Sequence, residues 1–261
     1  MAASRARSAH WSVVLVSLAA LLALGACTKP SRDLQPGSYR ATLEVPGGEL
    51  PFGLDVAKEE KGFVLYLVNG EERVPVTGAT VEPGKVSAVL PGSRNTLSAT
   101  IAGGELRGEV AFAGTGGARQ ALPFKATLGQ TWRFFAEALT DNVDVAGRWA
   151  VTFTDGQGRT TRGVAELQQK FERVTGSLRL TGGEQRLLTG EVHGDELRLS
   201  RFDGAVGHLY HATVNARGEL AGECWSLPAT RQRFVAVRNP DAVLDPDPAG
   251  TALHDEAAIA P

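Results

Sequence analysis

One pattern occurs twice in this sequence. "GGELRGEVAF" at residues 103–112 returns as "RGELAGECWS" at 217–226, an offset of 114 positions. Four further pairs follow in the same order at offsets of 110 to 113: "GSYRATL" at 37–43 with "GRWAVTF" at 147–153, "VTG" at 76–78 with "LTG" at 188–190, "ATI" at 99–101 with "ATV" at 212–214, and "FKATL" at 124–128 with "FVAVR" at 234–238. This period is longer than that of solenoid repeats. The sequence therefore predicts two sibling domains, 37–128 and 147–238.

Each copy is predicted to be all-β. Apolar residues alternate with polar ones, as in Tyr39, Ala41 and Leu43, and the runs are separated by turns such as "PGGE", "VNGEE" and "AGGE". Alternation of period two that is bounded by Gly, Pro, Asn or Asp is typical of strands. Glycine, at 31 of 261 residues, supplies the positive φ that tight hairpin turns require.

We expect about eight strands in each copy, joined by short connections. Because a meander of that length has two unpaired edges, we predict that each copy closes into a small antiparallel barrel, similar in outline to lipocalins or avidin. The alternative is an open, curled sheet. Residues 164–173 contain enough Glu, Gln and Lys to look helical, but the matching part of the first copy is strand-like, so we predict a strand there too.

The repeated Gly-Glu-Leu-x-Gly-Glu motif is interpreted as structural. Its first glycine closes a hairpin, Leu106 and Leu220 point inward, and Gly108 and Gly222 lie on the same face two residues later. A strand glycine in the inward phase suits a crowded interior or a bend.

The N-terminal residues 1–26 have the pattern of a secretory signal. Two arginines precede an apolar stretch that ends in small residues, and this stretch is short for a membrane span. The closing "LGAC" at 24–27 resembles the lipobox of bacterial lipoproteins. The resemblance implies cleavage before Cys27 and attachment of lipid to its sulfur and amine; the alternative is an ordinary signal with an incidental cysteine. Thr28 stands where an Asp would favour the inner membrane, so we expect a periplasm-facing protein on the outer membrane.

Three segments lie outside the two copies. Residues 27–36 are predicted to be a polar tether, and residues 239–261, with four Pro and no apolar periodicity, a disordered tail or linker. The inter-domain linker, 129–146, contains Trp132, Phe134 and Phe135. Because these aromatic side chains favour burial, we expect the linker to pack between the two domains, as a helical turn.

The charge balance disfavours nucleic acid as a partner. The chain has 27 Lys and Arg against 29 Asp and Glu, and a formal net charge of −2. Removal of 1–26, which contains two Arg and no acid, makes this −4. We find no basic patch and no strand-spaced aromatic platform.

The sequence offers no recognisable catalytic or metal site, and we expect no cofactor. Cys224, in phase with Leu220, is interpreted as a small buried residue with a raised thiol pKa. His208 and His211 are three apart on a predicted strand and so face opposite sides, which argues against a metal site. Glu105, Glu109, Glu219 and Glu223 are interpreted as solvated strand faces and Asp203 as a turn former; His193 lies in a predicted turn and His254 in the tail. Nucleophile-elbow, P-loop and zinc-ligand spacings are absent.

A wider resemblance bears on function. The run at 197–226, preceded by "GRWAVTF", and the opening "GSYRATLEVPGGELPFGL" at 37–54 resemble the N-terminal region of periplasmic TlpA-like thiol–disulfide oxidoreductase lipoproteins. In that family a thioredoxin-like domain with a Trp-Cys-x-x-Cys centre follows. This sequence contains no such centre, which implies either a truncated gene or a stand-alone relative of the accessory region.

We therefore expect a lipid-anchored, non-catalytic accessory or interaction module of the cell envelope. Its expected partners are the membrane and a periplasmic protein or fused redox domain. The alternative is an envelope lipoprotein that binds a small apolar ligand inside one barrel. Interiors filled by Phe, Leu and Trp would favour the module, whereas an apolar cavity of several hundred cubic ångströms would favour the carrier. We expect that the chain is not an enzyme, unless a thioredoxin-like domain has been lost from it by truncation.

Overall fold

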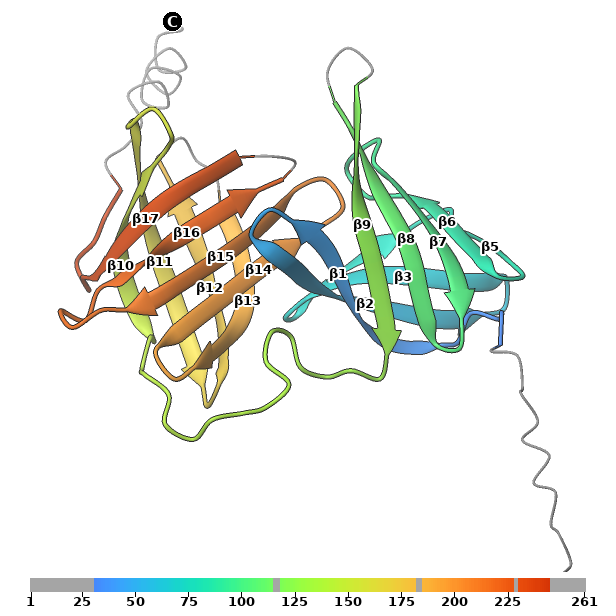
Figure 1. Cartoon of the computed structure of the whole chain (residues 1–261), viewed down its shortest axis with the longest axis horizontal. Coiled ribbons are helices and arrows are strands. Elements are labelled where there is room, and N and C mark those ends of the chain that lie inside the picture. The colour runs from blue at the N-terminus through green and yellow to red at the C-terminus, as the bar shows by residue number, and fades with distance from the viewer. Residues whose placement is uncertain (1–30, 115–117, 182–184, 228–229, 245–261) are drawn as a thin grey trace, which may run out of the picture. The chain divides into compact units, whose positions relative to one another are not determined.

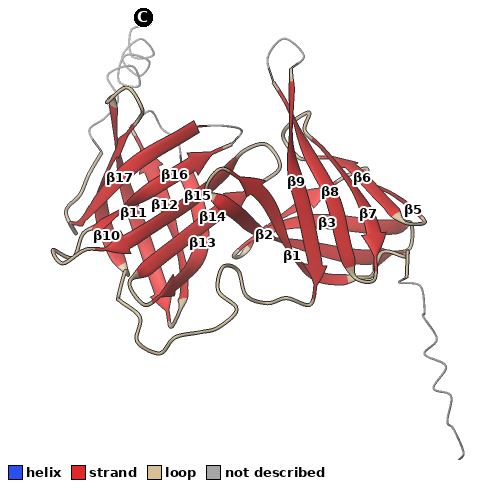
Figure 2. Ribbon diagram, in the orientation of Figure 1, coloured by secondary structure: helices blue, strands red, loops and turns tan. Residues whose placement is uncertain are grey.

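The computed structural model describes residues 31–114, 118–181, 185–227 and 230–244, and in these ranges the chain is all-β (Figures 1 and 2). None of the residues described forms a helix that is long and apolar enough to cross a membrane. The strands of the first copy are β1 (Gly37–Val45), β2 (Gly48–Glu59), β3 (Gly62–Asn69), β4 (Glu72–Val76), β5 (Thr80–Glu82), β6 (Lys85–Val89), β7 (Thr96–Ala102), β8 (Glu105–Ala113) and β9 (Arg119–Leu128). Those of the second are β10 (Gly147–Thr154), β11 (Thr160–Lys170), β12 (Arg173–Leu180), β13 (Gln185–His193), β14 (Glu196–Phe202), β15 (Gly207–Val214), β16 (Leu220–Ser226) and β17 (Thr230–Arg238).

The second copy is a closed antiparallel barrel of eight strands, as predicted. Each strand from β10 to β17 pairs with the next, and β17 returns to β10, with Trp149 opposite Arg238 and Phe153 opposite Phe234. The Glu/Gln/Lys-rich stretch lies mostly within β11, which pairs with β10 and β12. Its side chains alternate between a buried and a solvated face, so packing outweighs its helical composition.

The first copy is not a closed barrel, and that part of our prediction is wrong. Its nine strands form one curled sheet in the order β4-β3-β2-β1-β9-β8-β7-β6-β5. β1 pairs with β9, which joins the two halves of the sheet, while β4 and β5 are its two edges. The open, curled sheet that we held as the alternative describes this copy.

The difference between the copies is visible at one glycine of the repeat. Gly190 stays within β13, opposite Leu199, and a Cβ there would lie 1.8 Å from the Arg198 carbonyl oxygen. Its counterpart Gly78 instead has a φ of +76°. This left-handed conformation, which glycine tolerates, falls between β4 and β5. What is one strand in the second copy is therefore two short edge strands in the first.

The Gly-Glu-Leu-x-Gly-Glu motif has the structural role that we predicted. Gly104 and Gly218 are turn residues with φ of +83° and +74°. Leu106 and Leu220 follow them and are buried in the two interiors. At Gly222 a Cβ would lie 1.9 Å from the carbonyl oxygen of His211 on the neighbouring strand, so the close approach of β15 and β16 requires glycine there.

The two copies share part of one hydrophobic core. Phe202 and Leu209, from β14 and β15, point away from their own barrel and are fully buried among the core residues of the first copy. The Phe202 ring lies 4.8 Å from the Phe52 ring and 6.2 Å from the Phe112 ring, between centroids. The second copy thus supplies side chains that complete the interior of the first.

Candidate functional site

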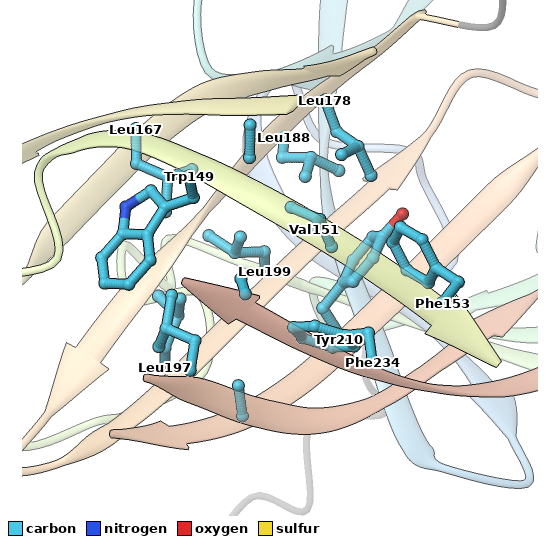
Figure 3. Close-up of a pocket in the computed structure, with 14 residues that line it drawn as sticks. Trp149, Val151, Phe153, Leu167, Leu178, Leu188, Leu197, Leu199, Tyr210 and Phe234 are labelled. Carbon is cyan, nitrogen blue, oxygen red and sulfur yellow. The ribbon is translucent and has the colours of Figure 1, made fainter. Parts of the chain in front are cut away.

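The interior of the closed barrel is lined by apolar side chains, with one hydroxyl among them (Figure 3). It contains a cavity of about 40 Å³. The side chains that line it are Trp149, Val151, Phe153, Ala165, Leu167, Leu178, Leu188, Leu197, Leu199, Tyr210, Ala212, Leu220, Phe234 and Ala236. A cavity of this size holds at most a few waters or a very small apolar molecule.

One end of the barrel is closed by Trp149 and the residues before β10. The Trp149 indole N–H donates to the Val145 carbonyl oxygen at 3.0 Å. The Arg238 guanidinium lies 4.4 Å from the centre of the Trp149 ring and donates to the carbonyl oxygens of Asp144 and Ala146. Residues that flank the barrel in sequence therefore seal this end.

Toward the other end, the interior changes from aromatic to polar. Phe153, Tyr210 and Phe234 pack against one another with ring centroids 5.6 to 6.5 Å apart, away from Trp149 (Figure 3). Tyr210 also belongs to a polar cluster next to these rings, which we call the buried polar cluster: Arg186, His208, Tyr210 and Cys224, which are buried, and Ser226, which is partly buried.

The buried polar cluster is linked by hydrogen bonds. Arg186 donates to the Tyr210 hydroxyl at 2.6 Å, and the same nitrogen lies 4.0 Å from the Cys224 sulfur. His208 Nδ1 and the Ser226 hydroxyl are 3.0 Å apart. Burial raises the pKa of the Cys224 thiol, and the nearby Arg186 charge offsets this only in part. Burial likewise raises the pKa of the Tyr210 phenol well above its usual range. Both groups are therefore protonated at neutral pH, and the thiol is a poor nucleophile.

The linker between the copies forms a second polar centre, which we call the linker clasp: Asn69, Arg133, Glu191 and Ser200. The Glu191 carboxylate, on β13, accepts hydrogen bonds from the backbone N–H groups of Arg133, Phe134 and Phe135 at 2.8 to 2.9 Å. Three successive N–H groups on one carboxylate give strong, charge-assisted hydrogen bonding. Desolvation lowers the pKa of Arg133 to about 10, while the Glu191 charge opposes the change.

The clasp also joins the two copies. Arg133 donates to the Ser200 hydroxyl at 2.9 Å and to the Asn69 side-chain oxygen at 3.3 Å. Asn69 pairs with the backbone of Phe202 through its amide N–H and its oxygen, and the Ser200 hydroxyl donates to the Pro51 carbonyl oxygen at 2.6 Å. The linker therefore packs against both copies, as expected, but through bends and not as a helical turn.

The aromatic residues of the linker are held by neighbouring cations and rings. The Arg40 guanidinium lies 3.9 Å from the centre of the Trp132 ring. Phe135 stacks on His193 with centroids 4.6 Å apart, and Arg198 lies over its ring at 5.0 Å. These contacts hold the linker against β1 of the first copy and against β13 and β14 of the closed barrel.

The residues singled out in the sequence do not converge on a reactive site. Cys27 and His254 lie outside the described residues. Cys224 is buried, as predicted; His208 lies inside the barrel, whereas His211 lies outside it, against the Trp225 ring. Within the described ranges no group of three or more His, Cys, Asp or Glu is placed to hold a metal ion.

The carboxylates of the repeat lie on outer strand faces. Glu105, Glu219 and Glu223 form ion pairs with neighbouring arginines, which contribute little in water, and Glu109 is exposed. Asp203 accepts hydrogen bonds from the N–H groups of Ala205 and Val206, the turn role that we predicted.

Sequence reasoning missed the charged residues of both polar centres. Arg186 stands two positions before Leu188 and shares its inward phase, which was the available signal. Asn69 and Glu191 gave no comparable signal, because their partners are Phe202 and Arg133, distant in sequence.

Comparisons with known proteins identify no family. No family model matches the chain, and no curated protein matches it. Among solved structures, a redesigned β-barrel, mFAP1, bound to DFHBI is 16% identical, with 36% of this chain and 94% of that chain covered and a TM-score of 0.30. A protein of unknown function from the DUF3598 family of Nostoc punctiforme is 14% identical, with 77% and 94% covered and a TM-score of 0.27. A Nitrosomonas europaea protein described as AttH is 11% identical, with 77% and 91% covered and a TM-score of 0.19. These similarities are too distant to carry a functional argument.

Proposed function

We propose that this chain is a lipid-anchored protein of the cell envelope that acts as a non-catalytic interaction module. The observation that carries the proposal is that side chains fill both interiors. The closed barrel retains about 40 Å³, far below the roughly 300–1,000 Å³ of typical small-molecule pockets. A fold with filled interiors presents its outer surface and loops to partners.

The first copy supports the same view. Its interior is filled by the aromatic rings of Phe52, Phe112 and Phe124 together with Phe202 from the second copy. The linker clasp then fastens the copies through Arg133 and Glu191. The shared core and the linker clasp thus keep the outer surfaces of the two copies in a fixed arrangement, as an interaction module requires.

The buried cysteine supports a non-catalytic role. Cys224 is 1% exposed and its pKa is raised, whereas a redox thiol must be accessible and partly ionised. The resemblance to the accessory region of TlpA-like lipoproteins makes a thioredoxin-like domain the partner that we propose first. On this proposal the redox chemistry belongs to that partner.

The anchor in this proposal is Cys27, which follows "LGA". Two or three acyl chains, each methylene contributing about 0.8 kcal/mol when buried, would hold the protein stably on a membrane. In cells fed labelled palmitate, the wild-type chain is expected to incorporate label and Cys27→Ser is not. Equal labelling of both proteins would contradict the lipid anchor.

A second candidate function is the binding of a small apolar ligand in the closed barrel. The cavity between Leu199, Tyr210 and Phe234 favours it, because its lining presents almost no polar surface. A ligand larger than a few atoms would have to displace side chains of a packed interior, which costs free energy.

One experiment separates the two candidates. The full chain is purified in mild detergent and examined by native mass spectrometry before and after extraction with organic solvent. The interaction module predicts a mass equal to that of the lipidated polypeptide, and crosslinked species in envelope fractions that disappear with Cys27→Ser. A stoichiometric extractable small molecule would overturn it in favour of the carrier.

A further inference from the structure

We propose that a surface groove beside the β11–β12 turn binds an extended segment of a partner protein in which apolar side chains are flanked by Lys or Arg. We call it the Phe171 groove; its lining includes Leu139, Asn142, Asp144, Gln169, Phe171 and Glu172. The inference rests on the proposed interaction function and gives it a location and a partner chemistry.

Two features of Phe171 are energetically unfavourable: its apolar side chain is exposed to water, and its backbone is in a strained conformation. Its side chain is 81% exposed, the highest value among the large apolar residues that the structure describes. Its φ is +57°, and within the described part of the chain it is the non-glycine residue with a positive φ. A bulky side chain is strained in this conformation, whereas Gly or Asn accepts it. Strain that is kept at an exposed position is a reason to look for function.

The turn that carries Phe171 is held firmly in place. The Gln169 amide N–H₂ donates to the carbonyl oxygens of Phe171 and Val143, both at 3.0 Å. The Gln169 oxygen accepts from the Val145 N–H at 2.8 Å. The Glu172 carbonyl oxygen accepts from the Val192 N–H at 2.7 Å. Since the turn is already ordered, it loses little conformational entropy of its own when a partner covers the ring.

The size of the groove suits a short peptide segment. Its volume is about 510 Å³, and a neighbouring hollow of about 130 Å³ shares Ala138 and Glu172 with it. Leu139, 43% exposed, gives a second apolar contact on the linker side of the groove.

The charge of the lining selects the partner. Asp144 and Glu172 line the groove, Glu137 lines the neighbouring hollow, and Arg173 is the one cation among the described residues that line either. Lys170, the last residue of β11, lines neither. The Arg238 guanidinium donates to the backbone carbonyl oxygen of Asp144, and no arginine side chain among the described residues forms an ion pair with the Asp144 carboxylate. Carboxylates beside apolar contacts are complementary to apolar side chains flanked by cations.

The test uses three fluorescein-labelled peptides and the full chain in detergent, with binding measured by fluorescence anisotropy. The peptide GKLKFKLKG has the proposed chemistry, GELEFELEG reverses its charges, and GKSKSKSKG removes its apolar side chains. We expect the first to bind at least roughly tenfold more tightly than either control. Equal binding of all three peptides would overturn the proposal.

The matched variants are Phe171→Asn and Val89→Ser. Phe171→Asn should weaken binding of GKLKFKLKG by roughly tenfold. The melting temperature should be equal or higher, because Asn adopts a positive φ with less backbone strain than Phe. Val89→Ser removes a side chain that is 56% exposed on β6 and should leave binding unchanged. Weaker binding cannot then be ascribed to unfolding.

Two further outcomes would overturn the groove. In one, Phe171→Asn binds the peptide as tightly as the wild type. In the other, vesicles of phosphatidylethanolamine and phosphatidylglycerol slow hydrogen exchange across residues 168–174 when the peptide does not, which would assign Phe171 to a lipid surface. If the wild-type chain binds none of the three peptides while its envelope crosslinks still form, the groove proposal is refuted and the interaction function stands.

Discussion

Phe202→Ala tests whether the second copy completes the core of the first. Phe202 belongs to β14 of the closed barrel, yet its side chain is fully buried against Phe52 and Phe112. If the two copies fold separately, truncating it should disturb its own barrel alone. If they share a core, the damage should appear in the first copy.

The expected loss follows from burial. Removing a fully buried Phe side chain typically costs about 3–5 kcal/mol, as lost transfer free energy plus the cavity left behind. The hydrogen bonds between the Phe202 backbone and the Asn69 side chain do not involve the Phe202 ring. They should therefore persist in the variant and limit any further loss of structure. For a chain of this size the loss corresponds to a drop of roughly 6–20 °C in melting temperature.

The assay combines urea unfolding with hydrogen exchange read by mass spectrometry. Urea unfolding gives the loss of stability, and hydrogen exchange shows where protection falls, which we expect in β2 and β8. Val235→Ala, on an outer face and 44% exposed, is the control and should change stability by no more than about 0.5 kcal/mol. A loss below about 1 kcal/mol, or a change confined to β14 and β15, would refute the shared core.

Three further predictions follow from the polar centres and the buried thiol. Glu191→Ala leaves three linker N–H groups and Arg133 without their carboxylate, so we expect a loss of about 3–5 kcal/mol and faster exchange at Phe134 and Phe135; unchanged exchange there would contradict the clasp. The raised pKa values of Cys224 and Tyr210 mean that the unfolded chain releases these protons at lower pH than the folded chain. The stability that they contribute is therefore fully present below the unfolded values of about 9 and 10 and is lost as the pH rises above these values toward the higher folded ones. Thermal melts between pH 8 and 11 should show a shallower decline in the double variant Tyr210→Phe/Cys224→Ala than in the wild type, and identical slopes would contradict this assignment. The full chain should not reduce insulin disulfides, and turnover that disappears with Cys224→Ala would show that the thiol is accessible after all.

The sequence by itself determined the strands, the repeat and the direction of most side chains. Period-two alternation placed Leu106, Leu220 and Cys224 in the interior, because successive side chains of a strand point to opposite faces. The turn glycines Gly104 and Gly218 were identifiable because tight turns need a positive φ. These properties depend on a few neighbouring residues, so they can be read locally.

The tertiary structure alone decided which faces are covered and where the sheets close. Gly78 and Gly190 occupy the same place in the repeat, but one is a turn residue and the other lies in a strand. The immediate neighbours do not predict that Gly78 lies in a turn and Gly190 in a strand, because each glycine follows a threonine. They differ in whether the flanking strands find partners on both sides, which is settled by pairing across the whole sheet.

The same holds for Phe202 and for the polar centres. Alternation places Phe202 on the outer face of its barrel, and only the presence of the first copy turns that face into a core. Glu191 and Arg133 are ordinary surface residue types in the sequence; Glu191 becomes buried and Arg133 partly buried because the linker crosses β13 at that point. Contacts between residues about 60 to 150 positions apart depend on how complete sheets pack, which local alternation does not encode.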